Sequence, residues 1–228
     1  RRTSGPISPR SHRVRASLPS VAERSSIGSI DRSTTAAGRL PPQWLQLGQD
    51  IDGKVQGEYS GSSVALSADG TIVAIGAPEI CWNSNAGHVR LYRLNGTSST
   101  WQQLGQDISG EAEGDKLGGR GPFFGGVQAG HSVALSADGS IVAIGAPKHE
   151  HAGHAQAGRV RVYERSSASL TWQQLGGDID GEALNEQLGE SVAMSANGTI
   201  LAIGTPGYTP GTSWYTGRVR LYRLDGTP

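Results

Sequence analysis

The sequence predicts an all-β fold, a β-propeller segment of about three four-stranded antiparallel blades that follow a disordered N-terminal arm. The main observation is a sixteen-residue stretch that occurs three times, as SVALSADGTIVAIGAP at 63–78, SVALSADGSIVAIGAP at 132–147 and SVAMSANGTILAIGTP at 191–206. A second observation is composition, because the 228 residues include 34 glycines and 11 prolines but one methionine and two phenylalanines. Repeats of short strands and turns indicate one array rather than separate domains.

Residues 1–40 differ in composition from the rest of the chain. They contain eight arginines against two acidic residues, with frequent Ser, Pro and Thr and no apolar periodicity. Such a segment buries too little apolar surface to offset the entropy of ordering it, so we predict that it is disordered. A basic arm for nucleic acid or an anionic membrane, a targeting segment, a phosphorylated tail and a plain linker all stay open.

From residue 41 to residue 228 the chain passes through the same elements three times, in repeats of roughly 44–100, 101–171 and 172–228. Each repeat opens on a Trp-led strand, at Trp44, Trp101 and Trp172, and continues through an acidic connection. The sixteen-residue stretch follows, and its Asp-Gly or Asn-Gly pair predicts a tight two-residue turn between two strands. After a loop of variable length, a Val-Arg-x-Tyr strand closes each repeat, at 87–94, 158–165 and 217–224.

The strand order and the number of blades bear on whether the array can close. Because it begins on a Trp-led strand and ends on a Val-Arg-x-Tyr strand, a closed ring could complete its last blade with the first strand. Three blades, however, are fewer than the roughly four to eight of typical propellers. We therefore expect further propeller blades in cis, or an oligomeric partner, to close the ring.

One face of the closing strand repeats an arginine and a tyrosine two residues later. These residues are Arg90, Arg161 and Arg220 with Tyr92, Tyr163 and Tyr222. A stacking platform for single-stranded nucleic acid is one interpretation. We favour packing between blades, with ion pairs to the acidic connections, so nucleic acid is not an expected partner.

The repeated motif resembles the FG-GAP repeat of integrin α-subunit propellers. Gly-x-Ser-Val-Ala leads into Gly-Ala-Pro, and Gly-x-Val-x-x-Tyr follows. The residues that carry the resemblance are Gly61, Gly76–Pro78, Gly87 and Tyr92, then Gly130, Gly145–Pro147, Gly158 and Tyr163, then Leu188, Gly189, Gly204, Pro206, Gly217 and Tyr222. It covers about residues 44–228 and implies ligand binding at the loop rim and a cell-surface or extracellular location. WD-repeat propellers are the alternative, although no Trp-Asp pair ends the closing strand.

The calcium site of the resembled family is predicted to be lost here. Its ligands lie in the turn inside the sixteen-residue stretch, where this chain offers only Asp69, Asp138 or Asn197. One side-chain oxygen group cannot supply the six to eight oxygen ligands that calcium prefers. Carboxylates of the acidic connections, such as Asp50 and Asp52, lack the later bidentate Glu of a calcium loop and are interpreted as solvated turns. No cofactor is expected.

Loops on one rim of the predicted propeller differ between repeats, whereas the turns on the other rim are uniform. Aromatic side chains in variable loops on a rigid scaffold are typical of binding surfaces. The candidate ligand-binding residues are Trp82, Arg120, Phe123, Phe124, Tyr208, Trp214 and Tyr215. Neutral drift of exposed loops is the alternative explanation.

A histidine-rich loop is the weak candidate for a metal site. His149, His151 and His154 are ligand types that zinc and copper favour, but no regular element sets their spacing. A polar loop without metal is the preferred interpretation. The repeated serines at Ser63, Ser132 and Ser191 occur once per repeat, which favours packing over catalysis.

These observations predict a non-enzymatic interaction module whose rim loops bind a protein or a glycan. The alternatives are a purely structural repeat segment of a larger surface or secreted protein, and an enzyme or metal-binding protein that uses the His-rich loop. Cys81 is the single cysteine, which excludes an intrachain disulfide, and no apolar stretch is long enough to span a membrane. The sequons at Asn95 and Asn197 leave glycosylation open.

Overall fold

The computed structural model describes residues 42–78, 87–110, 129–211 and 215–226. Residues Gln46–Pro228 form one compact unit. Every regular element in the described ranges is a β-strand, and none of these residues forms a helix that could span a membrane. The predicted disordered arm lies outside the described residues.

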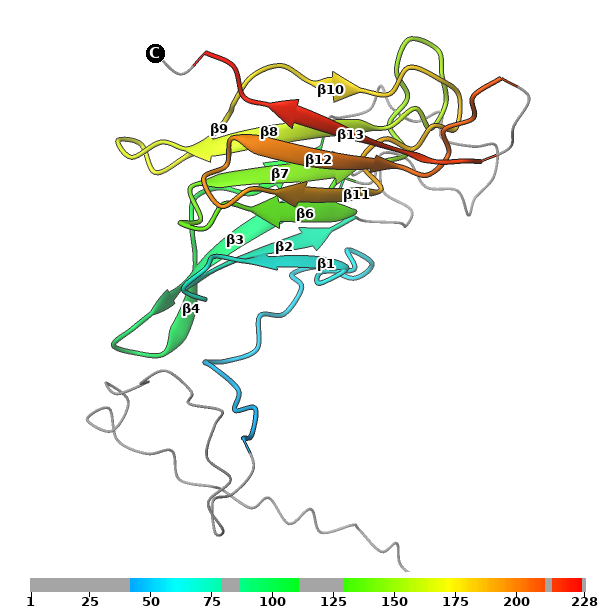
Figure 1. Ribbon diagram of the computed structural model, residues 1–228. Helices are drawn as coiled ribbons and strands as arrows, with labels where there is room; N and C mark the ends of the chain where they lie inside the picture. Colours follow the sequence, from blue (N-terminus) through cyan, green and yellow to red (C-terminus); the bar gives the residue numbers. More distant parts are fainter. Residues whose placement is uncertain (1–41, 79–86, 111–128, 212–214, 227–228) are drawn as a thin grey trace, which may run out of the picture. The chain divides into compact units, whose positions relative to one another are not determined.

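Three antiparallel sheets follow one another along the chain, and we call them blades 1, 2 and 3 (Figure 1). Blade 1 contains β1 (Ser63–Leu66), β2 (Ile72–Ala77), β3 (His88–Asn95), β4 (Thr100–Gln103) and β5 (Ile108–Ser109). Blade 2 contains β6 (Ser132–Leu135), β7 (Ile141–Ala146), β8 (Arg159–Arg165), β9 (Trp172–Gln174) and β10 (Ile179–Asp180). Blade 3 contains β11 (Ser191–Met194), β12 (Ile200–Thr205) and β13 (Arg218–Arg223). The predicted all-β propeller architecture is confirmed.

The fourth strand of blades 1 and 2 is divided into two short pieces. Both β4 and β5 pair with β3, and both β9 and β10 pair with β8. The interruption in blade 1 contains Gly105, whose φ of +79° is accessible to glycine without strain. The Trp-led strand therefore belongs to the same sheet as the Val-Arg-x-Tyr strand before it. Structural blades are offset from the sequence repeats by one strand.

The turn inside the sixteen-residue stretch is longer than predicted. In blade 1 the N–H of Gly70 donates to the carbonyl of Ser67 (2.9 Å), and the N–H of Ser67 donates to the carbonyl of Ile72 (2.9 Å). Only Gly70 of the turn has a positive φ, whereas a two-residue type I′ turn requires it at both central positions. The expected tight turn is wrong, because the side chain of Asp69 accepts a hydrogen bond from the N–H of Thr71 (3.0 Å) and supports a wider loop.

The core lies between the blades. Val89 and Leu91 of β3 are fully buried against Val133 and Leu135 of β6, in a cluster that also includes Trp172. A second cluster joins blades 2 and 3 through Val160, Leu188 and Ile203, among others. The first strands β1, β6 and β11 lie side by side in sequence order (Figure 1). Each blade thus buries its apolar face only against its neighbours, as in other repeat proteins.

Candidate ligand-binding loop edge

One edge of the blades carries the connections that differ between repeats. Its described segments are 53–62, 147–158, 181–190, 206–211 and 215–217, and we call it the loop edge. The turns 67–71, 136–140 and 195–199 lie at the opposite edge, because successive antiparallel strands alternate the edge at which the chain reverses. The predicted placement of the two kinds of connection at opposite edges is confirmed for the described segments.

Two of the predicted ligand-binding residues can be located on the loop edge. Tyr208 and Tyr215 lie in the connection between β12 and β13. The guanidinium carbon of Arg218 lies 3.8 Å from the centre of the Tyr208 ring, in a cation–π contact. Tyr215 is 64% exposed. The others, Trp82, Arg120, Phe123, Phe124 and Trp214, lie outside the described residues.

A buried glutamate anchors the loop edge of blade 1. Glu58 is 2% exposed, and its Oε1 accepts hydrogen bonds from the N–H of Lys54 (2.8 Å) and from Arg90 Nη1 (3.0 Å). Burial raises the pKa of Glu58, but the hydrogen bonds from Arg90 and from the Lys54 backbone outweigh it and hold the pKa below its usual value. Glu58 is therefore a charged group that fixes the connection to β1.

A buried glutamate bound by backbone N–H groups and arginines also occurs at the start of blade 3. Glu186 is 1% exposed, and its Oε2 accepts hydrogen bonds from the N–H groups of Glu182 (2.6 Å) and Ala183 (3.1 Å). Its Oε1 accepts hydrogen bonds from Arg218 and from Arg220 (3.2 Å). The sequence interpretation missed both glutamates. Their common position, five residues before the serine that begins the next strand, is the signal that could have found them.

In blades 1 and 2 the repeated arginine of the third strand pairs with an aspartate of the fourth strand. Arg90 Nε donates to Asp107 Oδ2 (2.8 Å), and Arg161 Nε donates to Asp178 Oδ1 (2.8 Å). The hydrogen bond from Arg161 is the main reason that the pKa of Asp178 is lowered to about 2. Tyr163 packs against the core cluster between blades 1 and 2. The predicted ion pairing is thus confirmed for Arg90 and Arg161, and the predicted packing between blades is confirmed for Tyr163.

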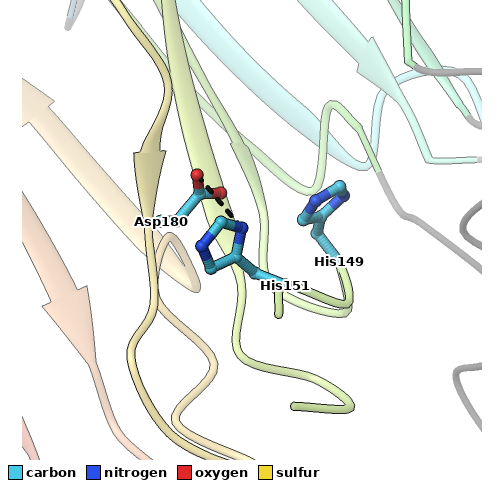
Figure 2. Close-up of side chains that lie close together, drawn as sticks. All are labelled: His149, His151 and Asp180. Carbon is cyan, nitrogen blue, oxygen red and sulfur yellow. Dashed lines mark ion pairs between the residues drawn. The ribbon is translucent and has the colours of Figure 1, made fainter. Parts of the chain in front are cut away.

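The histidine-rich loop of blade 2 brings two imidazoles close to a carboxylate (Figure 2). His149 is 3% exposed, and His151 Nδ1 lies 3.4 Å from Asp180 Oδ2. Ligand atoms of these three residues all lie within 4.8 Å of one another. His154 does not take part in this group. Its N–H instead donates to the carbonyl of His151 (2.8 Å) and closes the loop.

Two histidines and one carboxylate are a ligand set that zinc accepts. However, Asp180 is already engaged by Arg159, whose Nε donates to Oδ1 (2.5 Å) and whose Nη2 donates to Oδ2 (3.2 Å). Asp180 and Arg159 are directly opposite each other on β10 and β8, which places the guanidinium next to the imidazoles. A metal cation bound to Asp180 would be repelled by the guanidinium of Arg159 unless it displaced that side chain. In this structure the arrangement is a polar network, and a metal ion could bind Asp180 only if Arg159 moved away.

The repeated serines have a structural role. Ser63 Oγ donates to the carbonyl of Gly130 (2.7 Å), and Ser132 Oγ donates to the carbonyl of Gly189 (2.7 Å). Each serine thus links its blade to the next one. Each hydroxyl thus donates to a backbone carbonyl, whereas a nucleophilic serine donates to a general base.

The turn carboxylates also serve the fold. Asp69 Oδ1 accepts hydrogen bonds from Ser67 Oγ (2.6 Å) and from the N–H of Thr71 (3.0 Å). These bonds, with the one from Ser67 the largest cause, lower the pKa of Asp69 to about 2. Asp138 makes equivalent contacts with Ser136 and Ser140. Both carboxylates therefore close their own turns.

Comparisons with known proteins support no family assignment for this chain. No protein-family model matches the sequence, and no curated protein matches it. A crystal structure of RRP9 WD40 repeats is similar with a TM-score of 0.41 and 18% identity, over 71% of this chain and 41% of that chain. The Chaetomium thermophilum Sqt1 bound to the N-terminus of ribosomal protein L10 has a TM-score of 0.41 and 18% identity, over 72% of this chain and 31% of that chain. This chain thus spans less than half the length of either structure. The blade-by-blade topology described above is what identifies it as a β-propeller segment.

Proposed function

We propose that this chain is a non-enzymatic interaction module, an FG-GAP-like propeller segment whose loop edge binds a protein or a glycan. The observation that carries this proposal is that the strand framework repeats between blades, whereas the loop edge differs between them. The framework repeats from blade to blade in strand register and in the hydrogen bonds between blades. The loop edge instead carries groups that differ between blades, such as the His151–Asp180 pair in blade 2 and the Tyr208–Arg218 stack in blade 3.

This contrast favours recognition over catalysis. A rigid scaffold that carries different polar and aromatic groups on one edge is suited to contact a partner over an extended area. Catalysis would need a nucleophile or an acid–base pair aimed at a common point. Ser63, Ser132, Asp69 and Asp138 make their hydrogen bonds within the fold. The resemblance to integrin propellers agrees with a loop-edge ligand and favours a cell-surface or extracellular partner.

The experiment compares two variants of the chain for ligand capture. The loop-edge variant replaces Tyr208 and Tyr215 together with Trp82, Phe123, Phe124 and Trp214 by alanine. The control replaces Leu170, which is 57% exposed in the connection between β8 and β9, at the opposite edge. Both variants and the native chain are screened on a glycan array and by cross-linking to secreted proteins. We expect at least one ligand of the native chain that the control retains and the loop-edge variant loses.

The proposal fails if every ligand that the native chain captures is captured equally by the loop-edge variant. That result would favour the alternative function, a purely structural segment of a larger surface or secreted protein. Circular dichroism of both variants establishes that each is folded before binding is compared.

A further inference from the structure

The two outer faces of the array carry the apolar residues that are buried at the internal junction. On β13 the exposed fractions are 64% for Val219 and 73% for Leu221, and on β1 they are 63% for Val64 and 60% for Leu66. At the junction between blades 1 and 2, the same repeat positions are occupied by Val89, Leu91, Val133 and Leu135, which are at most 9% exposed. The two outer faces are therefore complementary halves of the contact that already joins blades 1 and 2.

Hydrogen bonds between blades follow a repeating series that matches the two outer faces in the same alignment. The Ala68 N–H donates to the carbonyl of Ala137 (2.8 Å), and the Ala137 N–H donates to the carbonyl of Ala196 (2.8 Å). The next donor in this series, the N–H of Ala196, makes no hydrogen bond within the described part of the chain, and neither does Ser191 Oγ, which follows Ser63 and Ser132 in the serine series. The acceptors that these two donors require are the carbonyls at the first repeat's positions, those of Ala68 and Gly61.

Blade 3 also lacks a fourth strand among the described residues, since β13 pairs only with β12. A segment with the required local structure lies before blade 1. Gln46 Nε2 donates to Asp50 Oδ1 (2.8 Å), as Gln103 Nε2 donates to Asp107 Oδ1 (2.6 Å) and Gln174 Nε2 to Asp178 Oδ1 (2.7 Å) in the true fourth strands. The carbonyl of Leu47 accepts the indole N–H of Trp101 (2.9 Å), as the carbonyl of Leu104 accepts that of Trp172 (2.9 Å). No described strand pairs with this segment, although it makes the same side-chain hydrogen bonds as the fourth strands of blades 1 and 2.

Charge and shape match between this segment and blade 3. In blades 1 and 2 the third-strand arginine binds the aspartate six residues after the Trp, and in this segment that aspartate is Asp50, which is exposed. The corresponding arginine of blade 3 is Arg220. A cavity of about 200 Å³ lies beside Gly176 and Leu175. Gly105 is the equivalent residue in blade 1, and the indole of Trp172 lies against it. The corresponding indole for the cavity beside Gly176 would come from Trp44, which is fully exposed.

We propose that residues 44–53 of a second copy of this chain complete blade 3, with Trp44 in the cavity and Asp50 on Arg220, while blade 1 of that copy packs on blade 3. The exchange is reciprocal, so two copies with three blades each close a six-bladed ring. Six blades lie within the range of about four to eight that closed propellers use. Closure removes the exposed sheet edge of β13 and both apolar faces. This proposal is independent of ligand binding at the loop edge.

The first experiment measures mass by light scattering and sedimentation over a range of concentrations. We expect a dimer that dissociates on dilution. Trp44→Ala removes a buried aromatic anchor at each of the two junctions, at roughly thirty-fold per junction, so it should raise the dissociation constant roughly 10³-fold. The matched control is Leu45→Ala. Leu45 is 80% exposed and occupies the position where the other fourth strands carry the exposed Gln102 and Gln173. A monomer at all concentrations, an open-ended polymer, or a dimer equally sensitive to both changes overturns the proposal.

A charge exchange tests the register. Asp50→Arg and Arg220→Asp should each abolish the dimer alone, because like charges then meet at both junctions. Mixed in equal amounts, the two variants should form a heterodimer, because every junction regains one arginine and one aspartate. A mixture that stays monomeric contradicts the proposed pairing. Arg220 also binds Glu186, so thermal unfolding is used to check that the Arg220→Asp variant is folded. If this variant does not fold, the comparison of Trp44→Ala with Leu45→Ala tests the dimer instead.

Discussion

Trp172 offers the sharpest test of how neighbouring blades are joined. It is 4% exposed in the core cluster between blades 1 and 2, although it belongs to β9 at the outer side of blade 2. Its indole N–H donates to the carbonyl of Leu104, and the side chain of Gln106 both donates to the Trp172 carbonyl (2.9 Å) and accepts from its N–H (3.0 Å). The fourth strand of blade 1 thus holds the tryptophan of blade 2.

The magnitude follows from this burial. A buried aromatic removes about 150–250 Å² from water, and at about 25 cal/mol per Å² this is an upper bound of about 4–6 kcal/mol. We expect Trp172→Ala to lower the free energy of unfolding by about 3–5 kcal/mol, the usual range for a buried aromatic. Trp172→Phe keeps most of the apolar contact but leaves the Leu104 carbonyl unpaired, so about 1–3 kcal/mol is expected.

The assay is urea unfolding followed by far-ultraviolet circular dichroism, with Trp101→Ala as the matched control. Trp101 makes the same contacts with Leu47 and Gln49, but it is only partly buried. At concentrations low enough for the chain to be a monomer, its replacement should therefore cost less than that of Trp172. Equal costs at the two positions, or a loss below about 1 kcal/mol for Trp172→Ala, would refute the argument from burial.

Three further predictions concern the turns, the blade contact and the histidine cluster. The pKa of Asp69 is lowered to about 2. The stability that its carboxylate contributes is therefore complete above the ordinary Asp pKa and is lost as the pH falls through about 2. In acid unfolding, the difference in stability between the native chain and Asp69→Asn should shrink over that pH interval. Gly145→Ala places a methyl group against a backbone carbonyl of blade 3 and should destabilise the chain by about 1–3 kcal/mol in urea unfolding. Arg159→Gln releases the carboxylate of Asp180 and should raise zinc affinity in calorimetry roughly tenfold.

Each of these predictions has a control. Asn197 already occupies the turn position of Asp69 in blade 3, so Asn197→Ala should show no acid-dependent change in stability. Gly204 is the blade 3 equivalent of Gly145, and the nearest atom to an added methyl group there is the Ser191 hydroxyl and not a carbonyl of another blade. In the monomer its replacement should therefore cost less than Gly145→Ala. His131 pairs with Glu190 (3.1 Å) on the same edge, and His131→Ala should leave zinc affinity unchanged. A native chain that binds zinc as tightly as Arg159→Gln would contradict the blocking role of the guanidinium.

Several features of the fold were predictable because they are local or repeat at a constant spacing. The strands around Asp69 follow from alternating apolar residues and a glycine that accepts a positive φ. The recurrence of Arg90 and Arg161 before a tyrosine also indicated a face between blades, where both arginines now pair with aspartates. The length of the turn was predicted wrongly, since the Asp side chain, and not the Asp-Gly pair, determines it.

Contacts between distant segments could not be read from such patterns. Asp180 meets His151 because β10 pairs with β8, and no local signal specifies that pairing. The burial of Glu58 likewise depends on Arg90, 32 residues further along the chain. Each contact of this kind is selected by how whole sheets stack, after the entropy of closing a long loop has been overcome.

The sequence by itself determined the repeating blade, the order of its strands and the edge on which variation gathers, because side-chain alternation and turn residues act over a few positions. Only the tertiary structure decided which blade each Trp-led strand completes, that Trp172 anchors it to the preceding blade, and which apolar faces stay exposed. The physical reason is that a strand's sequence specifies which face is apolar, whereas its hydrogen-bonding partner is selected by the packing of the complete array.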